Sequence, residues 1–160
     1  MSALHLPAID DAELLRQSAL PLPALAREGI ALFNRGEYFV QHEAFEHSWR
    51  AELGPVRALY QGVLQVGVAY LQITRGNHVG ASKMFQRAWQ RLDKLPDICQ
   101  GIDIAQLRTD AQAAQTELAR VGPAGMAGFD RSLLKPVIFA PRRPTSAEAD
   151  VSLCQARGAG

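Results

Sequence analysis

The apolar residues of this chain recur every three or four positions instead of alternating. This spacing places side chains on one face of an α-helix, and it argues against a fold built from half-buried strands. The pattern is clearest between Asp103, which is suited to an N-cap, and Gly122. The apolar residues in that interval are Ile104, Leu107, Ala111, Ala114, Leu118 and Val121. The spacing predicts an all-α fold.

Glycine and proline divide the rest of the chain into further helical segments. Gly36, Gly54 and Gly76 each stand where a helix is expected to end, and Pro96 closes another segment. The expected helices span about residues 10–19, 22–35, 37–53, 55–76, 77–95 and 103–122. Because the connections contain only a few residues, neighbouring helices should run antiparallel. We therefore predict an antiparallel bundle of about five to six helices.

The length of 160 residues suits one domain, since domains have about 150 residues. Residues 1–121 are expected to form the helical bundle. Residues 122–160 contain five Gly and four Pro, so they are expected to be a Pro/Gly-rich tail that is irregular or partly disordered. Within this tail, the apolar segment 133–140 is expected to pack on the bundle as an extended strap.

Charge and hydropathy exclude several classes of partner. Seventeen Lys and Arg against sixteen Asp and Glu leave a formal charge of +1, without the excess of basic residues typical of nucleic-acid binding. No apolar run approaches the roughly 18 residues of a membrane span. The N-terminus lacks a signal-peptide pattern, and Cys99 and Cys154 read as free thiols. We expect a cytoplasmic chain that binds neither nucleic acid nor membrane, with a homodimer left open.

A short pattern occurs twice, 40 residues apart. Each copy has an Arg-Gly pair followed by a Phe and a Trp that are four residues apart. The two copies are Arg35, Gly36, Phe45 and Trp49, and Arg75, Gly76, Phe85 and Trp89. The period fits a helix-turn-helix repeat unit, so an internal repeat is one hypothesis. In that case His42 and Glu46 correspond to Ser82 and Gln86, which favours a site role for the His/Glu pair.

His42 and Glu46 lie one helical turn apart. On a helical wheel they share an arc of about 100° with Tyr38, Phe45 and Trp49, so we expect them to point into the core. An unpaired polar group there costs about 1–3 kcal/mol, so both side chains need partners. The order of residues excludes the HExxH and HxxEH zinc motifs, and the chain contains no ExxH turn. What remains is HxxxE, which offers two ligands to a divalent metal such as Zn, Mn, Fe or Ni.

The following helix carries a polar stripe formed by Arg57, Gln61 and Gln65. If this stripe faces inward, Arg57 can pair with Glu46, and either glutamine can orient His42. Two glycines in the interior of the same helix, Gly62 and Gly67, cost about 1 kcal/mol each unless another helix approaches closely. The glycines therefore favour close packing around this helix.

These residues carry a resemblance to a known family. The blocks that match are FNRGEYF at 33–39, HxxxExxW at His42, Glu46 and Trp49, RxxxQGxxQ at 57–65, RGN at 75–77 and GA at 80–81. In this order they resemble the DUF309 family over about residues 25–93. The resemblance implies a small all-α bundle and a suspected metal-binding role for the HxxxExxW motif. It implies no established reaction.

Several readings of the His42–Glu46 pair remain open. The pair can be a structural hydrogen-bond network, supported by Tyr38, Trp49 and the polar stripe, or half of a divalent-metal site. His47 and His78 are the only other histidines that lie close enough in the sequence to be candidates for such a site. Catalysis with His42 as a general base lacks an accompanying nucleophile or phosphate loop, so enzyme activity stays undecided. The rival reading is a non-enzymatic helical interaction or scaffold module.

Overall fold

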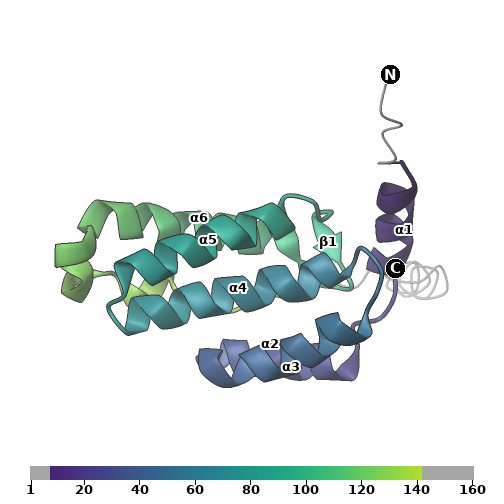
Figure 1. Ribbon diagram of the computed structural model, residues 1–160, viewed down its shortest axis with the longest axis horizontal. Helices are drawn as coiled ribbons and strands as arrows, with labels where there is room; N and C mark the ends of the chain where they lie inside the picture. The colour runs from purple at the N-terminus through teal and green to yellow at the C-terminus, as the bar shows by residue number, and fades with distance from the viewer. Residues whose placement is uncertain (1–7, 142–160) are drawn as a thin grey trace, which may run out of the picture.

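The computed structural model describes residues 8–141, and the structural statements below concern this part of the chain. Its α-helices are α1 (Ala8–Ser18), α2 (Ala24–Asn34), α3 (Tyr38–Ala51), α4 (Arg57–Thr74), α5 (His78–Leu92) and α6 (Ile104–Val121). Figure 1 shows α4 in the middle of the molecule, with α2 and α3 on one side and α5 and α6 on the other. The predicted all-α bundle is confirmed, and the helices lie within a few residues of the expected ranges.

The turns that follow α2 and α4 have the same geometry. Gly36 and Gly76 have φ angles of 77° and 71°, a left-handed conformation that glycine adopts without strain. In both turns the glycine N–H donates to the carbonyl of the residue three positions before it. The N–H of the residue after the glycine donates to the carbonyl five positions before that residue. These bonds are Gly36 to Phe33 and Glu37 to Leu32 at 2.9 Å each, and Gly76 to Ile73 and Asn77 to Gln72 at 3.0 and 2.8 Å. The matching turns support the internal repeat.

Close helix packing explains the two glycines inside α4. A Cβ at Gly62 would lie 2.9 Å from Leu92 Cδ2 on α5, and one at Gly67 would lie 2.5 Å from Gln41 Nε2 on α3. Real side chains do not approach so closely, so both neighbours depend on glycine. The predicted close approach is confirmed, and it places α4 tightly against a helix on each side.

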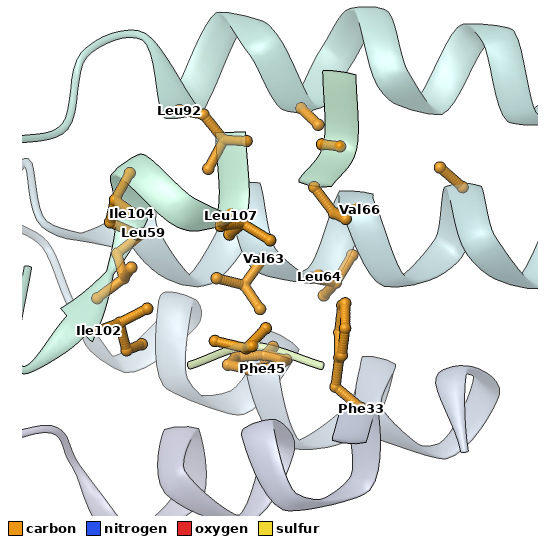
Figure 2. Packing of buried hydrophobic residues seen from close by; sticks show 14 of the residues in the cluster. Phe33, Phe45, Leu59, Val63, Leu64, Val66, Leu92, Ile102, Ile104 and Leu107 are labelled. Atoms are coloured by element: carbon orange, nitrogen blue, oxygen red, sulfur yellow. The ribbon is translucent and has the colours of Figure 1, made fainter. Parts of the chain in front are cut away.

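The hydrophobic core lies along both sides of α4. In Figure 2, Phe33 and Phe45 extend from the α2–α3 side toward α4, which carries Val63, and Leu92 and Leu107 lie on the opposite side. All five of these side chains are buried. Burying such a side chain contributes about 1.5–3 kcal/mol, so this continuous core is what holds the helices together.

After α5 the structure contains elements that the helical pattern did not predict. β1 (Ile98–Cys99) pairs antiparallel with β2 (Ile102–Asp103), and two 3-10 helices, Pro123–Gly128 and Arg131–Leu133, follow α6. Regular structure therefore continues beyond residue 122, contrary to the expected irregular tail. The short hairpin and the 3-10 turns have too few residues to show a period.

The strap predicted at residues 133–140 packs on the bundle. Asn34 Nδ2 donates to the carbonyl of Val137 at 3.0 Å, and the Val137 N–H donates to Asn34 Oδ1 at 2.8 Å. The Ala140 N–H also bonds the Gly101 carbonyl at 2.8 Å. The remainder of the predicted tail, including Cys154, lies outside the described residues. Within the described residues, no helix has the length and apolar character needed to cross a membrane.

Candidate functional site

The buried face of α3 differs from the predicted one. Its buried residues are Tyr38, Gln41, Ala44, Phe45 and Ser48. The centre of this face is rotated by about 80° from the arc of Tyr38, His42, Phe45, Glu46 and Trp49. The His42 side chain is 48% exposed and the Glu46 side chain 26% exposed. The prediction that both point into the core is therefore wrong. The aromatic residues suggested one face, whereas the small and amide side chains at 41, 44 and 48 pack more closely.

Gln41 is the buried polar residue of α3 that the sequence analysis missed. Its side chain is completely buried, and its Nε2 donates to the carbonyl of Leu64 on α4 at 3.2 Å. The amide lies directly against Gly67. Its Oε1 has no hydrogen-bond partner. Gly67 was the available signal, since a glycine inside a helix marks a place where a neighbouring group comes close.

Glu46 is the centre of a short ionic network on the surface of α3. His42 Nδ1 lies 3.5 Å from Glu46 Oε2, and an Arg50 Nη lies 2.5 Å from Glu46 Oε1. Both neighbours are one helical turn away, the spacing at which helical side chains meet. The predicted ion pair between Glu46 and Arg57 is not formed in the described structure. Arg50 occupies that place because it lies on the same helix.

Trp49 connects this network to Arg57. The Arg57 Cζ lies 5.1 Å from the centroid of the Trp49 ring, and the Arg50 Cζ lies 5.7 Å from it. The Trp49 side chain is half-buried and packs against the core. Each cation–π contact of this kind contributes about 0.5–1 kcal/mol at an exposed site. Arg57 therefore belongs to the site through the indole ring and not through the carboxylate.

The other predicted supporting residues do not reach His42. Tyr38 is buried against Phe33 and Tyr70, with ring centroids 5.4 and 5.8 Å apart, and its burial raises the pKa of its hydroxyl. Gln61 lines a surface depression beside Arg57. The Oε1 of Gln65 is buried without a hydrogen-bond partner. Neither glutamine forms a hydrogen bond with His42 in the described structure, so the predicted orienting contact is absent there.

His42 and Glu46 offer two protein ligands to a metal ion. Within residues 8–141 there is no group of three or more His, Cys, Asp or Glu side chains that could hold a metal ion. His78 lies elsewhere, with its Nε2 3.1 Å from the Leu118 carbonyl on α6. Cys99 is buried, which raises the pKa of its thiol to about 12. A metal bound here would share Glu46 with Arg50 and would need further ligands.

The described arrangement brings His42, Glu46, Trp49, Arg50 and Arg57 together on one surface, which we call the Trp49 surface. Comparison with known families gives a match between residues 26–84 and a family model described as "Domain of unknown function (DUF309)". Comparison with curated proteins gives no match. The family match covers α3 and α4 completely and confirms the resemblance stated from the motif. Residues 26–84, which include the Trp49 surface, are therefore similar to the DUF309 domain.

Proposed function

We propose that the chain is a non-enzymatic helical interaction module and that the Trp49 surface is its contact face. The observation that carries this proposal is the sharing of Glu46 between His42 and Arg50, with Arg50 and Arg57 over the Trp49 ring. These contacts order the exposed side chains before any partner arrives. Ordering in advance lowers the entropic cost of association.

The types of residue on this surface also favour a protein partner. Trp and Arg are the residues most enriched where protein interfaces gain their binding energy. Arg50 is exposed on this surface, and its guanidinium group lies over the Trp49 ring. The surface therefore combines an aromatic ring with charges of both signs.

A second copy of the same chain is the partner that these charges favour. In a two-fold dimer the same patch meets itself, so it must be self-complementary. The Trp49 surface carries the Glu46 carboxylate together with the Arg50 and Arg57 guanidinium groups, so each copy can offer both a cation and an anion. We therefore propose a homodimer that is formed through this face.

Light scattering across a range of protein concentrations tests the proposal. The parent is expected to reach twice the monomer mass, and Arg50→Glu is expected to weaken dimerisation at least about tenfold, because it reverses a charge of the self-complementary patch. Arg87→Glu is the matched control, since Arg87 is exposed on α5 outside the Trp49 surface. A parent that is monomeric at every concentration, or equal effects of the two variants, would contradict the homodimer.

Divalent-metal binding is the second candidate function. It is favoured by the 3.5 Å separation between His42 Nδ1 and Glu46 Oε2, which allows both atoms to contact one ion. The remaining ligands would come from water or from another molecule. Metal content and thermal shifts with Zn, Mn, Fe and Ni, for the parent and His42→Ala, test it. A stoichiometric metal that is lost in the variant would favour the metal site over a purely structural network.

A further inference from the structure

A basic depression lies where α4 begins and α5 ends, and neither His42 nor Glu46 lines it. We call it the α4–α5 depression, and it has a volume of about 420 Å³. The residues that line it are Pro55, Arg57, Ala58, Gln61, Arg91 and Lys94. Figure 1 shows these two helix ends on the same side of the molecule, near β1. Segments distant in the sequence therefore bring three cations to one hollow.

Within the described residues, the three cations of this depression have no carboxylate partner at ion-pair distance. None of its lining residues is acidic. Within the described residues, Arg57, Arg91 and Lys94 form no ion pair within 4.0 Å, whereas Arg50 and Arg108 are both paired with carboxylates. The dipoles of α4 and α5 oppose each other here, because one helix starts where the other ends. The field in the depression therefore comes mainly from the three side chains.

Two of the cations also have donors that lack an acceptor. The Nε atoms of Arg57 and Arg91 are buried, and neither has a hydrogen-bond partner in the described structure. Leaving a buried charged donor unsatisfied is costly, and a bound anion removes this cost. An arginine fork gains most from an oxyanion, which accepts two parallel hydrogen bonds from one guanidinium group.

Packing restrains the guanidinium group of Arg57 and the base of the Arg91 side chain. Arg57 lies on the Trp49 ring at 5.1 Å. The stem of Arg91 packs on α4, where a Cβ at Gly62 would lie 3.3 Å from the Arg91 Cβ. Both side chains thus approach the depression from fixed stems. A site that is ordered before binding loses less entropy when the ligand arrives.

We propose that the α4–α5 depression binds a phosphoryl group, as inorganic phosphate or as the phosphate of a small monoester. A phosphate monoester carries a charge of about −1.5 to −2 near pH 7 and three strong acceptor oxygens. Those oxygens match the two guanidinium groups and the Lys94 ammonium, and the Gln61 amide adds a further donor. A carboxylate has only two oxygens and one charge, so it satisfies fewer of these groups. This site shares Arg57 with the Trp49 surface, so the variants that test it are placed at Arg91 and Lys94, which lie outside that surface.

Calorimetric titration of the full chain with inorganic phosphate at low ionic strength tests this proposal, with methyl phosphate and acetate in parallel. We expect saturable binding of both phosphates and much weaker binding of acetate. Comparable methyl phosphate binding would indicate a monoester ligand, and its exclusion would restrict the site to the free ion. Acetate that binds as tightly as phosphate, or an absence of saturable phosphate binding, would overturn the proposal.

Single substitutions test whether phosphate binds in the α4–α5 depression. Arg91→Gln and Lys94→Gln are each expected to weaken phosphate binding about tenfold, because each removes one charge-assisted contact. Arg87→Gln is the matched control, since Arg87 is exposed on α5 one turn before Arg91. Lys94 is exposed beyond the end of α5, so its replacement keeps the test decisive even if Arg91→Gln lowers stability. Unchanged affinity in both site variants would contradict the assignment.

Discussion

The hairpin formed by α2 and α3 and the one formed by α4 and α5 share a scaffold but differ in what they expose. Phe45 and Phe85 are both buried, and Trp49 and Trp89 both lie half-buried one turn later. Both hairpins turn at a glycine with the same hydrogen bonds. The shared features are thus the ones that form the turn and the core.

The differences lie on the outer surfaces. The Trp89 Nε1 donates to Gln115 Oε1 on α6 at 2.7 Å, whereas the Trp49 ring is flanked by Arg50 and Arg57. The first hairpin has His42 and Glu46 where the second has Ser82 and Gln86. Because the second hairpin folds without a His/Glu pair, the scaffold does not require one. The pair is therefore available for a role on the surface.

The largest expected effect comes from the two buried phenylalanines. Phe45→Ala and Phe85→Ala should each lower the free energy of unfolding by about 3–5 kcal/mol, because each leaves a cavity in the core. Denaturant titration measures both. A large loss for one and a small loss for the other would break the proposed equivalence of the hairpins.

A smaller effect tests how closely each hairpin packs. Gly29 on α2 corresponds to Ala69 on α4, and a Cβ at Gly29 would lie 2.7 Å from the Phe45 ring. Gly29→Ala should therefore cost about 1–3 kcal/mol through overpacking. Ala69→Gly should cost about 1 kcal/mol through helix propensity and lost packing. Thermal unfolding distinguishes the two, and a neutral Gly29→Ala would show that the first hairpin packs less tightly than described.

The contacts of the two tryptophans should differ modestly in strength. Gln115→Ala removes the hydrogen bond of Trp89 and should cost about 1 kcal/mol. Arg57→Ala removes one cation–π contact of Trp49 and should cost about 0.5–1 kcal/mol. Indole fluorescence followed during unfolding reports on both. An Arg57→Ala variant as stable as the parent would count against the network on the Trp49 surface.

The helices and their ends were predictable from the sequence because each depends on local chemistry. Apolar spacing defined α6, and glycines marked the ends of α2 and α4. The orientation of α3 was not predictable in the same way. It depends on how Gln41 fits against Gly67, a contact 26 residues apart in the sequence that no local pattern reveals.

The candidate site was predictable in some of its members but not in its geometry. His42, Glu46, Trp49 and Arg57 do lie on one surface, but Arg50 takes the carboxylate that was assigned to Arg57. Competition between two cations for one acid depends on their side-chain positions, and the sequence does not give these. The basic depression was not predictable from a local motif, because Arg57 and Arg91 lie on different helices and are 34 residues apart in the sequence.

The most direct test of this account replaces His42 and Glu46 in the first hairpin with the corresponding residues of the second hairpin. The double variant His42→Ser and Glu46→Gln should lose less than about 1 kcal/mol in free energy of unfolding by denaturant titration, because ion pairs exposed to this extent contribute little. The account predicts that small loss, with the helical content unchanged. A loss above about 3 kcal/mol, the size associated with breaking a buried charge pair, would contradict this prediction. It would indicate that His42 and Glu46 are buried in the core.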